Sequence, residues 1–216
     1  MTATTAASLR DGREALLRPL VSDDRGLIIT AFDRLSEESR YRRFFAPLNE
    51  LSDQSLEYLT DIDHSDHEAI VALDPESGEL IGVARYVRVE PGSDRAEAAV
   101  VVADDWQHVG LGRALLERLV VRARAEGICR FTALVQADNR RALELLGEIG
   151  PTSRSPERGL VELDIELPEE RLGVALAAAL RAAASSVFGV RPLSERLFRA
   201  AHELWERRRP RSQWSV

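Results

Sequence analysis

The sequence lacks lysine altogether, has a single cysteine, and contains no long hydrophobic run. All 29 basic residues are arginine, so no lysine side chain of this chain is open to modification. One cysteine, Cys129, excludes an intramolecular disulfide and fits a reducing compartment. The longest apolar stretch, near residues 174–180, is too short to span a bilayer, and residues 1–14 lack the apolar core of a secretory signal. These absences predict a cytoplasmic protein with no membrane partner.

Composition places the chain among ordinary globular proteins. Of its 216 residues, 44% are hydrophobic and 30% are charged, which allows one domain plus an appendage. The 36 acidic residues outnumber the basic ones and give a net charge of −7. Because phosphate binding needs a local basic excess, we expect no nucleic-acid partner.

Hydrophobic periodicity divides the chain into three parts. Residues 1–12 are small and polar and are expected to be disordered. Residues 13–167 contain apolar residues at both helical and strand spacing. They predict an α/β domain with a mixed, mostly antiparallel sheet flanked by helices. Residues 168–216 predict a C-terminal helical extension of two helices, whose apolar stripes pack back on the domain, form a homodimer seam or meet a partner. Within the domain, strands are expected over residues 15–20, 69–73, 80–89, 96–103, 128–136 and 160–167, and helices over residues 23–35, 37–45, from 53, from 112 to 126 and 139–149.

The stretch from Glu97 to Gly112 carries the strongest chemical signal. A valine-rich strand leads into a loop with two glycines, Gly110 and Gly112, and a helix begins there. A helix N-terminus offers free backbone N–H groups and about half a positive charge, which together suit a diphosphate. Glycine allows the phosphate oxygens to approach the backbone, because no Cβ stands in the way.

Four interpretations of this loop compete. A P-loop needs a lysine, which the chain lacks. A dinucleotide-binding fingerprint needs a third glycine where Leu115 stands, and an early parallel strand. The pattern Gln/Arg-x-x-Gly-x-Gly/Ala after a strand fits Gln107, Gly110 and Gly112. A tight turn without a ligand stays open on the loop alone.

Together with the element order and the sequence Asn139-Arg140-Arg141-Ala142 opening the next helix, this loop resembles the GNAT superfamily of acyl-coenzyme A-dependent N-acyltransferases. The resemblance covers residues 13–167 and implies a GNAT-type sheet in which the strand before the loop splays from its neighbour. It implies acetyl-CoA as co-substrate, no metal, and direct attack by an amine. The implied cofactor-binding residues are Val100, Val101 and Val102 along the pantetheine arm, Gln107, His108, Val109, Gly110, Leu111, Gly112, Arg113 and Ala114 around the pyrophosphate, and Asn139 near the distal arm.

Residues 97–107 resemble bacterial protein lysine acetyltransferases of the Pat type, and residues 59–67 do so more weakly. That resemblance implies a protein lysine as acceptor and Glu97 as catalytic general base. With an ordinary pKa of about 4.3, Glu97 needs burial to raise that pKa, or acts through water. The structural alternative is a strand-end glutamate paired with Arg85 or Arg95. A small-molecule amine acceptor, and a non-catalytic acyl-CoA-sensing module, are the rival functions.

Two departures and three polar candidates complete the analysis. The usual tyrosine that protonates the leaving thiolate corresponds to Leu146, and the usual Gly-Phe is Gly150-Pro151, which puts the final strand pairing in doubt. His67 is a substrate-binding candidate. His108 adds charge to the loop or is simply exposed. The acidic and histidine residues of 61–67 match no standard zinc spacing, so we expect no metal.

Overall fold

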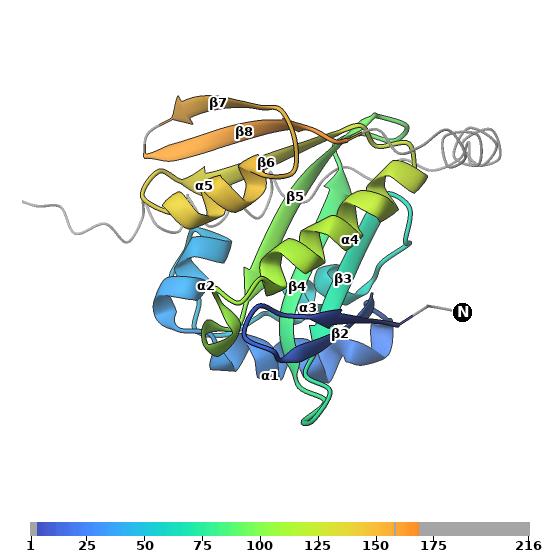
Figure 1. Ribbon diagram of the computed structural model, residues 1–216, viewed down its shortest axis with the longest axis vertical. Coiled ribbons are helices and arrows are strands. Elements are labelled where there is room, and N and C mark those ends of the chain that lie inside the picture. Colours follow the sequence, from blue (N-terminus) through green and yellow to red (C-terminus); the bar gives the residue numbers. More distant parts are fainter. Residues whose placement is uncertain (1–3, 158, 169–216) are drawn as a thin grey trace, which may run out of the picture.

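The computed structural model describes residues 4–157 and 159–168 (Figure 1). The two predicted C-terminal helices and the homodimer seam that they could form lie outside the described residues.

One eight-stranded sheet runs through the domain in the order β1-β2-β3-β4-β5-β6-β8-β7. Every neighbouring pair is antiparallel except β5 and β6, which are parallel. This confirms the predicted mixed, mostly antiparallel sheet. The strands are β1 (Thr5–Ser8), β2 (Glu14–Pro19), β3 (His67–Leu73), β4 (Leu80–Arg88), β5 (Arg95–Val102), β6 (Arg130–Gln136), β7 (Thr152–Glu157) and β8 (Leu160–Glu166).

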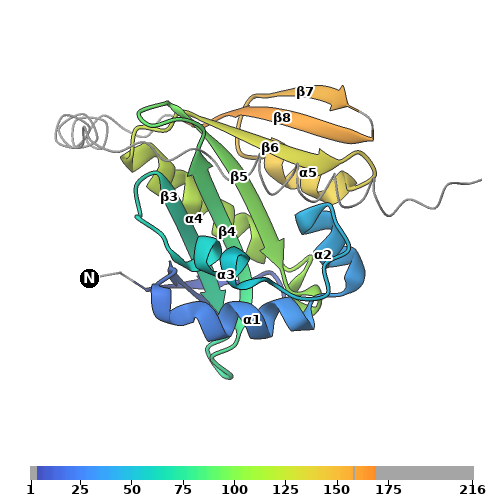
Figure 2. The same ribbon diagram turned by 180° about the vertical axis from the view of Figure 1, so that it is seen from behind.

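Helices cover both faces of this sheet. The helix α4 crosses β3, β4 and β5 on one face, and α1 and α3 lie on the other (Figures 1 and 2). Leu115 and Leu119 of α4 are fully buried, each worth about 1.5–3 kcal/mol of transfer free energy. The helices are α1 (Arg25–Arg34), α2 (Glu37–Phe44), α3 (Asp53–Thr60), α4 (Leu111–Ala125) and α5 (Arg140–Gly147), with short 3-10 turns η1 (Ser22–Asp24) and η2 (Asp104–Trp106).

Three helices that frame the site begin at side-chain caps. The side chains of Ser36, Ser52 and Asn139 each accept a hydrogen bond from the backbone N–H three residues later, at the start of α2, α3 and α5. Such a cap satisfies one of the donors that a helix leaves free at its N-terminus, and its loss costs about 1 kcal/mol. The sequence therefore fixes locally where these helices begin.

The expected disorder of residues 1–12 is corrected by strand β1, which pairs with β2 along its whole length. Leu9 after it is buried, and the Arg10 amide donates to the Val109 carbonyl at 2.9 Å. Small polar side chains give no periodic signal, whereas the strand is held by backbone hydrogen bonds, which every residue type except proline can both donate and accept.

The edge strand β7 has no counterpart in the predicted elements. It pairs with β8, which also pairs with β6, so the final pairing that Gly150-Pro151 put in doubt is made. Pro156 sits in β7 at the sheet edge, where its missing donor is tolerated. A Cβ on Gly150 would come 2.1 Å from the Glu166 carbonyl oxygen, so the chain needs glycine there.

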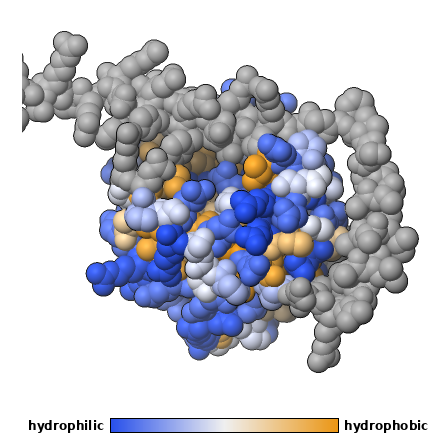
Figure 3. Space-filling model, turned by 90° about the horizontal axis from the view of Figure 1, so that it is seen from above, coloured by the Kyte–Doolittle hydropathy of each residue, from blue (hydrophilic) through white to orange (hydrophobic). Residues whose placement is uncertain are grey.

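Seen from above, the described surface is mostly hydrophilic, with apolar side chains in small groups between polar ones (Figure 3). Within residues 4–157 and 159–168, no helix combines the length and apolarity that crossing a membrane requires.

Candidate functional site

The strands β5 and β6 separate after three residue pairs. Their parallel pairing covers only Arg95–Glu97 of β5 and Arg130–Thr132 of β6. Beyond that point β6 continues against β8, and β5 continues against β4 as far as Val102. One edge of residues 98–102 is therefore without a partner strand, which agrees with the splay implied by the resemblance.

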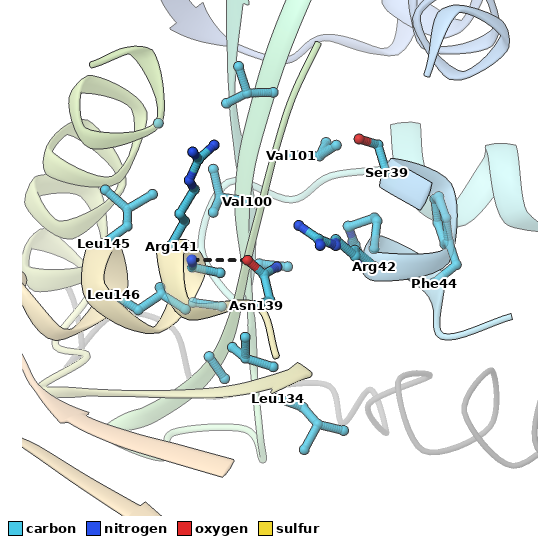
Figure 4. A pocket seen from close by; sticks show the side chains of 18 of the residues that line it. Ser39, Arg42, Phe44, Val100, Val101, Leu134, Asn139, Arg141, Leu145 and Leu146 are labelled. Carbon is cyan, nitrogen blue, oxygen red and sulfur yellow. Dashed lines mark hydrogen bonds between the residues drawn. The ribbon is translucent and has the colours of Figure 1, made fainter. Parts of the chain in front are cut away.

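A cavity of about 1680 Å³ opens along this gap. The helix α2 borders it on one side, with Arg42 and Phe44, and α5 borders it on the other, with Leu145 and Leu146 (Figure 4). Val100 of β5 lies between them (Figure 4). Single small-molecule sites usually measure about 300–1,000 Å³, so this cavity has room for two substrates together.

The glycine loop stands at the end of β5, where α4 begins. Gly110 caps α4 with a φ of 96°, and His108 has a φ of 68°, both in the left-handed region. No acceptor among the described residues takes a hydrogen bond from the amides of residues 108–113. Free amides at the N-terminus of a 15-residue helix make an anion site. The expected diphosphate chemistry fits this geometry.

Two of the expected pyrophosphate contacts are already used inside the protein. The Gln107 amide donates to the Asp104 carbonyl at 3.2 Å, and that of Ala114 donates to Gly110 at 3.1 Å. The Gln107 side chain donates to Asp104 Oδ1 at 3.0 Å and to the Val102 carbonyl at 3.2 Å. Gln107 thus holds the loop in shape, and the amides that face outward begin at residue 108.

Most of the remaining cofactor candidates line the same cavity, whereas Val109, Leu111 and Ala114 do not. His108 is exposed and contacts Arg141 of α5, with 3.1 Å between His108 Nδ1 and Arg141 Nη1. Arg113 is ion-paired with Glu117 and Glu148. Asn139 accepts from the Ala142 amide at 3.2 Å, as Figure 4 shows. The side chains of Val100, Val102 and Val109 pack on one core cluster, that of Val101 packs on the other, and Leu111 is buried, so these residues offer mainly their backbone.

The N-terminal segment braces the loop from outside. The guanidinium of Arg13 stacks 4.0 Å from the ring centre of buried Trp106 and donates to the Asp105 carbonyl at 3.1 Å. Arg10 Cγ lies 3.6 Å from where a Cβ on Gly110 would stand. The loop is therefore clamped between η2 and a segment almost 100 residues earlier in the chain.

Glu97 lines the cavity at the last position where β5 pairs with β6. Its side chain is exposed, so the burial that we expected is absent. Within the described part of the chain no ion pair includes it: Arg95 pairs with Asp164, and Arg85 contacts His67 and Leu59 instead. The structural alternative of a Glu97–arginine pair is thus not what the structure contains.

Three further residues line the α2–α3 side of the cavity: Arg43 and Tyr58, which the sequence did not indicate, and Arg85, which it offered only as a partner for Glu97. Burial, together with the neighbouring charge of Arg43, lowers the pKa of Arg85 to about 9. Burial also lowers the pKa of Arg43 and raises that of Tyr58. The available signal was an arginine inside the apolar run of β4, which a fully buried strand rarely contains.

His67 lies behind these residues and is absent from the cavity lining. Its ring stacks on Tyr58 with 5.1 Å between the ring centres, and its Nε2 is 3.3 Å from Arg85 Nη1. Burial, with the charge of Arg85, lowers its pKa to about 4, so the ring is neutral at pH 7 and accepts from Arg85. The structure brings His67 to the site only through Tyr58 and Arg85.

The other polar residues of the 61–67 segment have structural partners. Asp63 accepts from the Ser65 and His67 amides, and Asp66 pairs with Arg88 at 2.6 Å. His64 pairs with the fully buried Glu68. Among the described residues, no three His, Cys, Asp or Glu side chains gather as a metal site would require.

Leu146, at the position of the usual tyrosine, is buried and lines the cavity (Figure 4). Its side chain has no proton to give. The arrangement offers a bare strand edge and an anion-binding loop on one side, and a carboxylate with a tyrosine and two arginines on the other.

Comparison with known proteins gives a consistent family. Residues 32–150 match the model of the acetyltransferase (GNAT) family. The chain is 38% identical over 146 residues to the acetyltransferase PA5475 of Pseudomonas aeruginosa, which covers 66% of this chain and 77% of that protein.

Two further relatives are Pat proteins. The acetyltransferase Pat of Mycolicibacterium smegmatis is 31% identical over 160 residues, which are 74% of this chain but only 48% of that protein. The crystal structure of the GNAT domain of S. lividans PAT superposes with a TM-score of 0.70 at 34% identity, over 76% of this chain and 97% of that one. The likeness is therefore to the catalytic domain, and about half of the Pat protein has no counterpart here.

Proposed function

Because the chain belongs to the acetyltransferase (GNAT) family, we propose that it acetylates lysine side chains of proteins, with Glu97 as general base. The family moves an acetyl group from acetyl-CoA to an amine, and that is the reaction class of this enzyme. The likeness to Pat proteins over the sheet and the loop supports the protein acceptor.

One observation carries the proposal: Glu97 stands where the bare edge of β5 begins, in a cavity that also holds the free loop amides. The residues fit acetyl-CoA, because the amides of residues 108–113 have no acceptor in the part of the chain that the structure describes. Acetyl-CoA supplies the activated acyl carbon. The loop amides bind its diphosphate, and the β5 backbone positions its arm.

Glu97 provides the proton acceptor. A lysine amine with a pKa of about 10.4 is neutral in only about one molecule in 2,500 at pH 7, a cost of about 4.6 kcal/mol. A base near the amine lowers this cost along the reaction path. Because Glu97 is exposed, we infer that it takes the proton through a water molecule. The amine attacks the acyl carbon directly while both substrates occupy the cavity.

The lysine-free sequence makes the test unusually clean, since acetyl-lysine detected after the reaction cannot lie on a side chain of the enzyme. Purified enzyme is incubated with a lysate and with acetyl-CoA whose acetyl group carries a heavy isotope, so that newly added acetyl groups differ in mass from those already present. We expect new acetyl-lysine on added proteins together with release of free thiol.

Two results would overturn the proposal in different ways. Thiol release with amino acids or polyamines but not with proteins would establish a small-amine acetyltransferase. Calorimetric binding of acetyl-CoA without thiol release with any amine would establish an acyl-CoA sensor.

A further inference from the structure

The acceptor side of the cavity holds two arginines whose positive charge the described residues offset only in part, through the nearby carboxylate of Glu97. Arg85 is only 5% exposed, and its guanidinium donates to two neutral groups, the Leu59 carbonyl at 3.0 Å and the ring of His67. Arg43 lies half-buried over the ring of Phe44, with 5.1 Å between its Cζ and the ring centre. Within the described residues neither arginine has a carboxylate within 4 Å.

Two arginines next to them in the fold are paired. Arg42, next to Arg43 on α2, pairs with Glu38, and the buried Arg88 of β4 pairs with Asp66 at 2.6 Å. Both Arg43 and Arg85 line the cavity, as does Glu97. Arg43 and Arg85 thus place positive charge without a salt bridge in the wall that faces the acceptor.

The strand register places Arg85 and Glu97 on one face of the sheet. In the β4–β5 pairing Arg85 is opposite Ala99, and Val87 is opposite Glu97. Directly opposite residues point to the same face, so Arg85 and Glu97 are diagonal neighbours, with Cβ atoms about 7–8 Å apart at most. A molecule whose amine lies at Glu97 has Arg85 within a few bonds.

Burying a charge without an opposite charge costs several kcal/mol, and a bound anion recovers that cost. Arginine is also the side chain whose planar fork matches a carboxylate. We propose that the acceptor carries a carboxylate, which Arg43 and Arg85 bind while the amine lies at Glu97. This inference rests on the proposed acetyltransferase function and specifies its acceptor.

One chemistry has two possible sources here. The carboxylate belongs to an aspartate or glutamate beside the target lysine of a polypeptide, or to a free amino acid itself. The polypeptide source follows from the function proposed above, and the experiment separates the two.

The first arm compares two peptides that contain one lysine followed by glutamate or by its neutral isostere glutamine, both with blocked termini. We expect kcat/KM to be about tenfold to a hundredfold higher for the glutamate peptide, since hydrogen bonds to charged groups contribute that much. In Arg85→Met and in Arg43→Met the ratio falls toward one. Two variants are used because Arg85 is buried and also holds Leu59, whereas Arg43 is half-buried.

Arg34→Met is the matched control. It removes the same charge from α1, where Arg34 pairs with Glu79 outside the cavity, and the preference for glutamate should persist. Equal rates for the two peptides in the wild type, with both acetylated, would overturn this inference and leave the proposed function standing.

The second arm uses free amino acids and their amides. Acetylation of the free acids alone, with peptides unreactive, assigns the carboxylate to an amino acid: the inference stands, and the protein-lysine function falls. Equal rates for acids and amides, with peptides unreactive, would remove both.

Discussion

The two walls of the cavity are built in opposite ways. The cofactor wall comes from one nearly continuous stretch, β5 through α4, and works mainly through backbone amides and a bare strand edge. The acceptor wall gathers Arg43, Tyr58 and Arg85 from three elements and works through side chains. A backbone site depends on where glycine is allowed, whereas a side-chain site depends on which residue each element supplies. The backbone site can be predicted from a local sequence motif, whereas the side-chain site can be identified only once the fold is known.

The largest expected effect tests the backbone character of the cofactor wall. Gly110→Asp should abolish binding of coenzyme A in calorimetry, because the new carboxylate stands at an anion site and a side chain is strained at a φ of 96°. Gly78→Asp is the control, since Gly78 also has a positive φ, 71°, but lies in the β3–β4 turn. The control should bind normally. Unimpaired binding by Gly110→Asp would contradict the anion-loop assignment.

The next effect should appear in turnover alone. Glu97→Gln is expected to lower kcat about 100- to 10,000-fold, the usual contribution of a general base, and to leave the affinity for acetyl-CoA near that of the wild type. Glu90→Gln makes the same change in the β4–β5 turn, outside the cavity, and should be silent. An unchanged kcat would take Glu97 out of the mechanism and shift catalysis entirely to the cofactor wall.

The next prediction concerns the free energy of unfolding, which should fall at acid pH because of a histidine behind the acceptor wall. His67 has a pKa of about 4 in place of 6.5, so its neutral ring contributes stability above pH 6.5 that disappears as the pH falls through 4. The contribution is about 3 kcal/mol. Gln at this position keeps an acceptor for Arg85 without the titration. Denaturant unfolding measures this. Between pH 7 and pH 4 the unfolding free energy of His67→Gln should fall by about 3 kcal/mol less than that of the wild type. Parallel pH curves for the two proteins would refute the assignment.

The smallest effect concerns the connection between the walls. Asp104 accepts from the Ser36 amide and Ser39 of α2, and from Gln107 of the loop. Burial raises its pKa, but these hydrogen bonds outweigh burial and lower it. Asp104→Asn should raise KM for both substrates about two- to tenfold, in line with one or two lost hydrogen bonds. Asp105→Asn, whose side chain lacks such bonds among the described residues, is the control. An effect on one substrate only would show that the walls act independently.

Much of the fold could be read from the sequence, because burial leaves a periodic pattern. The alternation in 160–167 and the 3.6-residue spacing in 139–149 predict β8 and α5 to within a few residues. The strands β1 and β7 were not predicted, because Thr5–Ser8 and Thr152–Glu157 are edge segments without an apolar face. Their pairing comes from backbone hydrogen bonds and from the fit of Gly150, neither of which has a sequence period.

The same contrast holds for the site. The loop was predicted because its glycine spacing at one helix start is local, and Glu97 because the continuous stretch 97–107 resembles Pat-type proteins. Arg43 and Tyr58 are 54 and 39 positions before Glu97, and nothing in their own surroundings marks them as site residues. The prediction for His67 was close in space but wrong about contact with the cavity, because Tyr58 and Arg85 line the cavity and His67 packs behind them.

The brace formed by Arg10 and Arg13 has a practical consequence for anyone handling this protein. A shortened version that begins at residue 14 would look harmless from the sequence, yet it would remove the Arg10–Val109 hydrogen bond and the cation stacked on Trp106. Removal of residues 1–13 would therefore lower the affinity for coenzyme A, although these residues are about 100 positions before the loop in sequence. Tags and cuts belong elsewhere.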